Sequence, residues 1–561
     1  MKKNFHKYKL WFVVTGTLLV SMFSFSFVDD YFEVSKNLDI FSSVYREINM
    51  YYVDTTDPGK LVKKSIDSML ETLDPYTNYI PESDIEDFRF LTTGQYGGIG
   101  ALIKQKGENV IISDPYEGYP AQKAGLIAGD LILEIDGKIV KNKRTDEISR
   151  MLKGSPKTPV RLLIQREGES KPFEKTIVRE EIKVKSVPYY GMVTDDIGYI
   201  RLNSFTENAS REVSDAIKDL RKQHSLKGLV FDLRNNPGGL LNEAVNISNL
   251  FVEKGQDIVS TKGRIKDLNK TYKALNEAID TNLPLAVLVN SGSASASEIV
   301  SGSLQDLDRG VVIGQRTFGK GLVQTTRPLS YNTQLKITTS KYYIPSGRCI
   351  QALDYSHRNE DGSVGKVPDS LVTEFKTRAG RKVFDGGGIL PDIKLDPSKL
   401  SNISISLLNK NLIFDYATRY HRDRQQISSV KDFHLTEADF RDFVVFLSDK
   451  EYDYTTRSEK TMEDLKKNSE DEKYFADIQN EYTALKNKLA HNKQADVEKN
   501  KTEILQLLEE EIISRYYYQS GRIESSLQHD TELKKAVEII HDPVLYTGIL
   551  NGSLNADAGK K

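Results

Sequence analysis

The residues best suited to covalent chemistry lie in one stretch of the sequence, 286–324. An apolar, β-branched run at 284–290 predicts a buried strand, which ends in the small-residue segment Ser291–Ser297. The apolar spacing after this segment predicts a helix. Ser295 is therefore expected where the strand turns into the helix, with main-chain N–H groups pointing outward. A serine hydroxyl in that position is a candidate nucleophile.

A lysine follows on the same stretch. A second strand is predicted at 311–313 and leads into Thr317–Gly321, where Lys320 stands between two glycines and its amine can approach another main chain closely. Serine and lysine together suit hydrolysis by a serine that is activated by an amine rather than by a histidine. The alternative is a small-residue turn and a solvated surface lysine, and the residue types alone favour that alternative.

The complete stretch resembles the signature of the C-terminal processing peptidases, also called tail-specific proteases, which use a Ser/Lys dyad. The resemblance implies that Ser295 is the nucleophile, Lys320 the general base and Gln324, one helical turn further on, the group that orients the lysine. It also marks Asp306 as an auxiliary candidate. A free lysine has a pKa of about 10.4, so its site must lower the pKa by roughly two to three units. Burial between glycines and beside Phe318 is expected to supply that shift.

A second loop is expected to face the serine. The run Gly228–Leu233 predicts a buried strand, and the tight turn Arg234–Gly239 follows at its carboxyl end, where ligands bind in α/β layers. The resemblance implies that this loop gives one main-chain N–H to an oxyanion hole, and that the residue after the nucleophile gives the other. These donors are Gly239, chosen over Gly238, and Ala296. Without the serine motif, the residue types of this turn would indicate only an ordinary connection between a strand and a helix.

Residues 88–183 resemble a PDZ domain in the circularly permuted order of bacterial proteases. A glycine-rich loop comes first, the pattern GLxxGDxIxxIDG follows at 125–137, and a helix is predicted at 145–152. Consecutive N–H groups in the loop can converge on a terminal carboxylate while the peptide adds as an extra strand beside 99–103. The predicted partners are protein substrates with free, apolar C-termini. The loop residues implied to bind them are Gly97, Gly98, Ile99 and Gly100.

The chain is predicted to be multidomain, mixing α+β and α/β regions, because 561 residues exceed a single core. The expected order is a signal or anchor segment, an N-terminal helical segment, a PDZ-like β-rich domain, an α/β (crotonase-like) serine peptidase core and a helical C-terminal extension. Their predicted boundaries are 1–29, 30–87, 88–183, 184–400 and 401–561. The family resemblance covers 31 to about 400.

The N-terminus predicts export. Four lysines precede an uncharged run at 10–28, which ends at Asp29 and Asp30. The length fits a short membrane span, and no small-x-small cleavage site precedes Asp29, which favours an uncleaved anchor over a cleaved signal peptide. We therefore expect a protein of the bacterial cell envelope, on the periplasmic side of the inner membrane, anchored there or soluble if the signal is cleaved.

Composition excludes several other classes of function. The net charge of −2, from 78 basic and 80 acidic residues, provides no basic field for nucleic acid. One cysteine, Cys349, cannot form an intrachain disulfide, and the eight histidines show neither an HExxH pair nor a Cys/His cluster. No metal and no cofactor are expected.

The C-terminal extension, 401–561, leaves two interpretations open. Apolar residues repeat at helical spacing, for example around Ile403 and Ile504, and 459–501 is densely charged and predicts an exposed helix or partial disorder. The extension either binds a partner or mediates oligomerisation, or it is a helical bundle that only supports the protease.

These patterns together predict an exported, membrane-associated serine endopeptidase that recognises the C-terminal tails of protein substrates. The alternative is a catalytically silent PDZ scaffold that binds protein C-termini. The presence of both Ser295 and Lys320 favours the enzyme.

Overall fold

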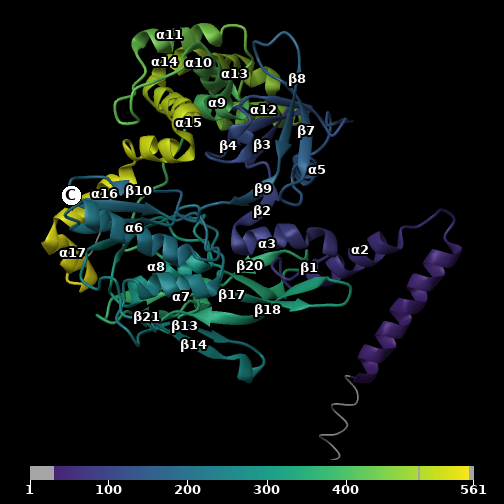
Figure 1. Ribbon diagram of the computed structural model, residues 1–561, viewed down its shortest axis with the longest axis vertical. Coiled ribbons are helices and arrows are strands. Elements are labelled where there is room, and N and C mark those ends of the chain that lie inside the picture. The colour runs from purple at the N-terminus through teal and green to yellow at the C-terminus, as the bar shows by residue number, and fades with distance from the viewer. Residues whose placement is uncertain (1–30, 490–492, 555–561) are drawn as a thin grey trace, which may run out of the picture. The chain divides into compact units, whose positions relative to one another are not determined.

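The computed structural model describes residues 31–489 and 493–554. The chain divides into two compact units, Met1–Tyr79 and Ile80–Lys561 (Figure 1). The predicted signal or anchor segment, 1–29, lies outside the described residues. Elsewhere in the chain, the described helices include none that is both long and apolar enough to cross a bilayer.

The described part of the first unit is helical, as predicted. Residues 31–51 form one helix, and α2 spans Pro58–Glu71. The Asp57 side chain caps α2 by accepting a hydrogen bond from the N–H of Lys60 at 3.1 Å. Pro58 fits the first turn because no intrahelical N–H bond is needed there. The short strand β1 (Asn78–Ile80) lies at the boundary between the two units, and η1 (Glu82–Asp84) and α3 (Ile85–Thr93) follow.

A six-stranded sheet in the order β10-β11-β12-β15-β16-β23 is the centre of the second unit. β10 runs antiparallel to β11, and the strands from β11 to β23 pair in parallel. The buried strands predicted near 228–233, 284–290 and 311–313 are confirmed. The six strands span Tyr189–Met192, Ile197–Arg201, Gly228–Asp232, Leu285–Val289, Val311–Gly314 and Ile393–Lys394.

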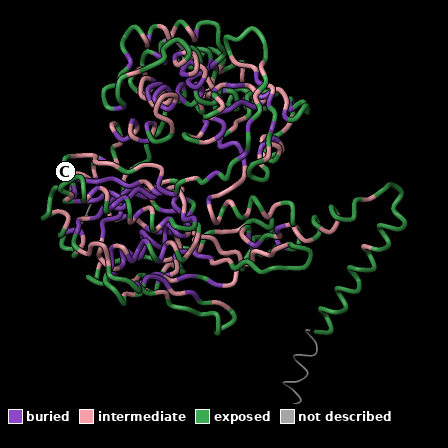
Figure 2. Tube along the Cα trace, in the orientation of Figure 1, coloured by how far each residue is buried: buried purple, intermediate pink, exposed green. Residues whose placement is uncertain are grey.

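Side chains alternate between the two faces of this sheet, and both faces are buried. On β12, Leu229 and Phe231 pack against one face with helices α6, α7 and α8, whereas Val230 packs against the other. These helices span Ala209–Gln223, Leu241–Asn249 and Ala296–Asp306. Figure 2 shows the buried segments gathered where this sheet lies. The result is a layered α/β core, in agreement with the predicted fold class.

The second face of the sheet is covered by the end of the chain. Helices α16 (Thr531–His541) and α17 (Pro543–Leu550) contribute apolar side chains, among them Leu533 and Ile549, to the same cluster as Val230. These two helices of the predicted C-terminal extension therefore pack directly on the peptidase core. Burial of the second sheet face requires them, because parallel strands that are apolar on both faces need a layer on each side.

A second sheet carries the segment that follows Lys320. β17 (Leu322–Pro328) pairs with β18 (Gln334–Tyr343), which pairs with β13 (Asp257–Lys262), and β14 (Lys270–Lys273) lies next to β13. Two small hairpins complete this part of the unit, β19 (Leu353–Arg358) with β20 (Val364–Lys366), and β21 (Glu374–Lys376) with β22 (Lys382–Phe384).

The PDZ region is a sheet in the order β3-β4-β5-β7-β8, with β6 paired to β5. Helix α5 spans Thr145–Leu152, the range that the sequence predicted, and buries Ile148 and Leu152 in the core of this sheet. A separate pair, β2 and β9, precedes and follows the main sheet in the chain. The strands β2 to β9 span Gln95–Gly98, Ala101–Lys106, Asn109–Pro115, Leu131–Ile135, Lys138–Ile139, Pro159–Gln165, Phe173–Val178 and Glu180–Lys183, and α4 spans Pro120–Lys123.

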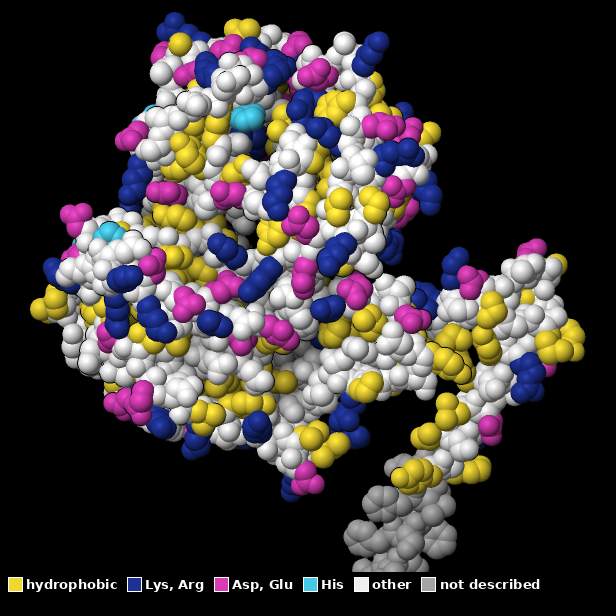
Figure 3. Space-filling view, in the orientation of Figure 1, with side chains coloured by type: hydrophobic (Ala, Val, Ile, Leu, Met, Phe, Trp, Pro, Cys, Tyr) yellow, Lys and Arg dark blue, Asp and Glu magenta, His cyan; other side chains and the backbone are white. Residues whose placement is uncertain are grey.

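Helices α9, α10, α11, α14 and α15 form a bundle with its own core, and this bundle packs against the PDZ region through Phe414, which clusters with Ile111 and Ala128. The charged segment 459–501 forms several short helices, with residues 490–492 outside the description. Figure 3 shows basic and acidic side chains interspersed over the face in view. Helices α9 to α15 span Asn402–Asn409, Leu412–Asp423, Glu437–Phe446, Arg457–Asp471, Phe475–Leu489, Lys493–Lys499 and Lys501–Leu527.

Candidate active site

Ser295 lies where the sequence predicted, between β15 and the first residue of α8. Its backbone has φ +55° and ψ −112°, a conformation that side-chain-bearing residues rarely adopt and that clusters at functional sites. All residues of α8 are buried, whereas Ser295 itself is half-buried. The turn thus exposes one serine at the N-terminus of a buried helix, where the helix dipole favours developing negative charge.

Glu298, on the first turn of α8, joins the serine turn to the lysine loop. Its Oε2 accepts hydrogen bonds from the N–H of Ser295 at 2.8 Å and from the N–H of Lys320 at 2.9 Å. Its Oε1 accepts from the N–H of Gly319 at 2.7 Å and from the Thr317 hydroxyl at 2.5 Å. One fully buried carboxylate therefore fixes two segments that are far apart in sequence.

Tyr342, on β18, joins the same two residues from the carbonyl side. Its hydroxyl lies 3.1 Å from the carbonyl oxygen of Ser295 and 2.7 Å from that of Lys320, and it can donate to either. Because Glu298 holds the N–H groups of these residues, the main chains of Ser295 and Lys320 are connected through both their donors and their acceptors. The structure therefore brings together the two residues that the sequence singled out.

Burial shifts the pKa of both bridging side chains. Loss of solvent raises the pKa of Glu298 to about 6, although its four hydrogen-bond donors oppose the shift. Burial, with a smaller contribution from the nearby Glu298 charge, raises the pKa of Tyr342 well above its usual range. At neutral pH the bridge therefore consists of an ionised carboxylate and a neutral hydroxyl, which are the forms that accept and donate as described.

Two expectations about the lysine's surroundings are wrong. Gln324 does not lie one helical turn beyond Lys320, because the intervening chain is extended and enters β17, with an irregular register between Val323 and Gln324. The Gln324 amide nitrogen donates to Thr338 Oγ1 at 3.1 Å, so the neighbouring strand fixes the amide. Phe318 is about half exposed, at 49%, and does not form the apolar shield that was expected around the half-buried lysine.

The predicted oxyanion loop packs directly against the serine turn. A Cβ atom at Gly238, where φ is +100°, would lie 2.8 Å from Ala296 N and 2.9 Å from Ser295 Cβ, so only glycine fits. The N–H of Gly238 already donates to the Asn236 side chain at 2.9 Å. Within the described part of the chain, the N–H groups of Gly239 and Ala296 donate to no protein acceptor. This difference favours Gly239 over Gly238 as the loop donor.

Asp306 lies at the other end of α8, about 16 Å from Ser295 along the helix axis. It forms a buried ion pair with Arg348 at 2.7 Å and accepts from the N–H of Ser346, while burial raises its pKa. The structure therefore does not bring Asp306 to the serine, and its contacts are those of a structural ion pair.

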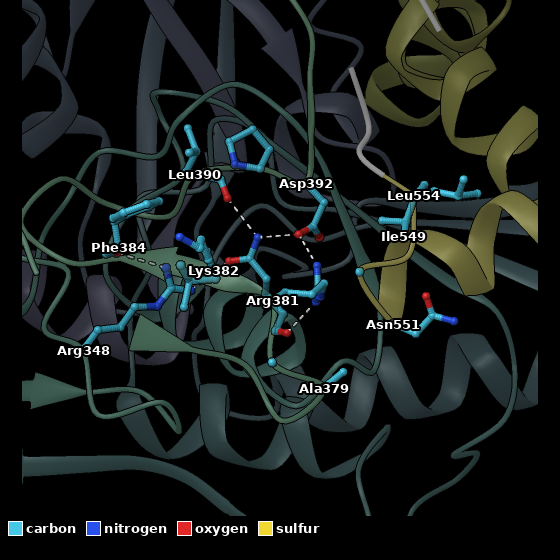
Figure 4. Close-up of a pocket in the computed structure, with 15 residues that line it drawn as sticks. Arg348, Ala379, Arg381, Lys382, Phe384, Leu390, Asp392, Ile549, Asn551 and Leu554 are labelled. Atoms are coloured by element: carbon cyan, nitrogen blue, oxygen red, sulfur yellow. Dashed lines mark hydrogen bonds and ion pairs between the residues drawn. The ribbon is translucent and has the colours of Figure 1, made fainter. Parts of the chain in front are cut away.

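A cavity of about 400 Å³ opens beside this end of α8 (Figure 4). Its charged lining residues are already paired, since Arg381 binds Asp392 and Arg348 binds Asp306. Neither Ser295 nor Lys320 lines it. Among the residues that the structure describes, no group of three or more His, Cys, Asp and Glu side chains is arranged to hold a metal ion.

The four residues predicted to bind a carboxylate are divided between a strand and a turn. Gly97 and Gly98 belong to β2 and pair with β9, so the expectation of one continuous loop is wrong for them. Ile99 and Gly100 form the turn before β3, and their N–H groups have no protein acceptor among the described residues. β3 is one of the two edge strands of its sheet. An edge strand next to unpaired N–H groups is the geometry that strand addition requires.

Sequence reasoning missed two groups that organise this site. Glu298 could have been found, because Ser-x-x-Glu before an apolar run is a capping-box pattern, in which the glutamate binds the main-chain N–H of the serine. Tyr342 carries no local signal, since its contacts depend on how β18 packs against the loops.

A PDZ fold, a layered α/β core and a serine turn bound to a lysine loop define a protease class, and comparisons with known proteins agree. Models of peptidase family S41, of a PDZ domain and of the C-terminal helical domain of a probable PDZ-protease match residues 196–355, 111–166 and 403–540. The chain belongs to this family, the C-terminal processing peptidases, and is a serine protease. Family membership also disfavours the silent-scaffold alternative.

Several relatives carry matching names. A carboxy-terminal-processing protease of Bartonella bacilliformis is 41% identical over 342 residues, which cover 60% of this chain and 76% of the relative. A probable CtpA-like serine protease of Staphylococcus aureus is 40% identical over 389 residues, 68% of this chain and 75% of the relative. The solved structure of a photosystem II D1 C-terminal processing protease is 28% identical with a TM-score of 0.35, and covers 64% of this chain and 93% of its own.

Proposed function

We propose that this protease cleaves peptide bonds with a Ser/Lys dyad, in which Ser295 is the nucleophile and Lys320 the general base. The observation that carries the proposal is the double bridge between these residues, through Glu298 Oε2 on the N–H side and Tyr342 Oη on the carbonyl side. A base that activates a serine must be held at a fixed position relative to it, and this bridge fixes both main chains.

The reaction follows from the positions of these groups. Ser295 Oγ attacks the scissile carbonyl carbon while its proton passes to the neutral Lys320 amine. The N–H groups of Gly239 and Ala296 stabilise the oxyanion that forms, with help from the N-terminal dipole of α8. The C–N bond then breaks as the lysine protonates the departing amine, and water, deprotonated by Lys320, hydrolyses the acyl-enzyme. Gln324 orients the lysine from β17 without adding charge.

Two substitutions test the dyad. Ser295→Ala and Lys320→Arg should each abolish peptide hydrolysis, the second because a guanidinium keeps the charge but does not deprotonate. Lys273→Arg, at an exposed ion pair on β14, is the matched control and should keep wild-type activity. Substantial activity in Lys320→Arg would show that the base has been assigned incorrectly.

The PDZ region selects substrates by their C-terminal tails. The proposal is supported by the unpaired N–H groups of Ile99 and Gly100 and by the unpaired edge of β3, beside which α5 lies. A terminal carboxylate would bind at the turn, and the peptide would extend along β3 as an added strand. Apolar terminal side chains suit the apolar side chains that β3 and α5 contribute to the core of this domain.

Amidating the C-terminus of a model peptide should weaken its binding at least about tenfold, which corresponds to roughly 1.4 kcal/mol. Gly100→Ala should have a similar effect, because its Cβ would lie 2.5 Å from Tyr119 Cβ. Gly118→Ala is the matched control, since Gly118 also has a positive φ, +77°, but open space around it. Equal affinity for the acid and amide peptides would contradict tail recognition.

Residues 10–28 direct export and hold the protein at the periplasmic side of the inner membrane. The basic flank followed by nineteen uncharged residues supports this proposal. Fractionation of cells tests it. Mature protein that begins near residue 29 in the soluble periplasmic fraction would show a cleaved signal instead of an anchor.

A further inference from the structure

The guanidinium of Arg234, at the base of the predicted oxyanion loop, binds three carboxylates. Its Nη2 lies 2.6 Å from Asp232 Oδ2 and 2.6 Å from Asp530 Oδ2, and its Nη1 lies 2.7 Å from Glu532 Oε2. Asp232 is the last residue of β12, directly below the loop, and it also accepts from the Tyr199 hydroxyl at 2.6 Å. The arginine is only 15% exposed, so these charge-assisted bonds are shielded from water.

Two of the three carboxylates come from the N-terminal turn of α16, near the end of the chain. Asp530 uses its other oxygen, Oδ1, to cap α16 by accepting from the N–H of Leu533 at 2.9 Å. Glu532 uses its other oxygen, Oε1, to accept from the side chain of Gln315. Gln315 follows β16 and begins the loop that carries Lys320. The first turn of α16 thus contacts the base of both loops.

Arg234 and Gln315 lie at the same distance in sequence from the two residues proposed to act in catalysis. Arg234 precedes Gly239 by five residues, and Gln315 precedes Lys320 by five residues. Helix α16 is itself held against the sheet, because it lies over β12, β15 and β16 and buries Ala536 and Ile539 there. Its N-terminal turn therefore has a fixed position from which to hold both loops.

We infer that Asp530 and Glu532 are positioning residues of the protease, which set the relative positions of the oxyanion loop and the lysine loop through Arg234 and Gln315. The inference rests on the proposed roles of Gly239 and Lys320. On this inference, the first turn of α16 contributes to catalysis by positioning the two loops, in addition to covering the sheet. Three carboxylates around one guanidinium leave excess negative charge, which the N-terminal dipole of α16 helps to stabilise. A role confined to stability would need the ion pair but not the second contact of Glu532 with the lysine loop.

The test is Glu532→Gln in the full-length protein. An amide at this position has one oxygen for Arg234, and its NH2 group meets an acceptor only if the Gln315 amide turns, so both contacts lose the carboxylate charge that strengthens them. We expect kcat for a peptide substrate to fall about tenfold, with KM within twofold of the wild type and the melting temperature little changed. Glu538→Gln, on the same helix but at an exposed ion pair with Lys535, is the matched control and should leave kcat unchanged.

A swap variant distinguishes positioning from stability. Combining Glu532→Gln with Gln315→Glu preserves the total charge, and the amide at 532 can then donate to the carboxylate at 315 while its oxygen accepts from Arg234. The swap should restore most of kcat. A wild-type kcat in Glu532→Gln, or a swap no more active than the single variant, would overturn the inference. So would failure of both variants to fold, because the contact would then serve folding alone. Failure of the dyad proposal would appear separately, as hydrolysis by Ser295→Ala.

Discussion

Replacing Glu298 by glutamine tests whether its carboxylate holds the catalytic loops together. Four donors converge on the carboxylate, from Ser295, Lys320, Gly319 and Thr317. An amide offers one oxygen and one NH2 group. In the arrangement of lowest free energy, the amide oxygen takes the place of Oε2, so it still accepts from the N–H groups of Ser295 and Lys320. The NH2 group then takes the place of Oε1. The Thr317 hydroxyl can turn to accept there, but the Gly319 N–H cannot.

The expected change in stability is small, because two effects oppose each other. A buried N–H left without an acceptor costs about 1–3 kcal/mol. Burial raises the pKa of Glu298 from 4.5 to about 6, so the ionised form is disfavoured by about 2 kcal/mol, a cost that the neutral amide avoids. The melting temperature should therefore shift by a few degrees at most. The loop of Lys320 nevertheless loses an anchor beside the base, and we expect kcat to fall about tenfold.

The pH dependence distinguishes this explanation from a general defect. Since the folded state raises the pKa of Glu298, the stabilisation linked to its proton is fully present below pH 4.5 and is lost as pH rises through about 6. Catalysis has the opposite requirement, because only the ionised form accepts all four donors. In the wild type, the slope of log kcat/KM against pH should therefore steepen from one to two below about pH 6.

The Glu298→Gln variant should lack this steepening, since it has no proton to gain at that position. Glu243→Gln is a matched control, because Glu243 is also on the first turn of a core helix and accepts one main-chain N–H, that of Ser210, but lies outside the bridge. It should keep the wild-type profile. A Glu298→Gln variant with wild-type kcat and an unchanged two-proton limb would refute the proposed role of the carboxylate.

Two further substitutions test the surroundings of the proposed dyad. Gln324→Glu places a negative charge near the lysine, raises its pKa and should move the ascending limb of the kcat/KM profile to higher pH by on the order of one unit; an unmoved limb would show that Gln324 does not face the amine. Tyr342→Phe removes the hydroxyl that contacts the carbonyls of Ser295 and Lys320. In a denaturant titration, the free energy of unfolding should fall by about 1–2 kcal/mol. In steady-state kinetics, kcat should fall severalfold while KM stays constant. Wild-type kcat in Tyr342→Phe would separate the bridge from catalysis.

The parts of this molecule that sequence reasoning predicted are those encoded locally. The strand-to-helix turn at Ser295, the buried strand of β12 and the helix α5 each follow from short-range periodicity and breaker residues. Gln324 was placed wrongly for a local reason. The segment after Gly321 was treated as helical because of the four-residue spacing, although its β-branched residues favour the strand that forms.

The remaining features depend on contacts between distant segments, which periodicity does not encode. Nothing near Val230 indicates which helices cover its face of the sheet, and the answer, α16 and α17, lies about three hundred residues further on. The same applies to Tyr342. It lies on β18, in the second sheet, and its hydroxyl contacts the carbonyl oxygens of Ser295 and Lys320 on two loops. Burial of Glu298 likewise becomes visible only once both loops pack over it.

The C-terminal helices contact both the PDZ region and the loops of the proposed dyad. Helix α15 contacts the PDZ region where Gln122 donates to the Tyr518 hydroxyl at 2.8 Å. Gln122 follows Ala121, whose N–H binds the carbonyl of Ile99 at 2.7 Å in the proposed carboxylate turn. The chain then continues from α15 into α16, whose first turn contacts the loops of the proposed dyad. The contacts of 401–561 with the PDZ region and with the loops of the proposed dyad agree with the interpretation of this segment as a support for the protease. Its role in binding a partner stays a prediction.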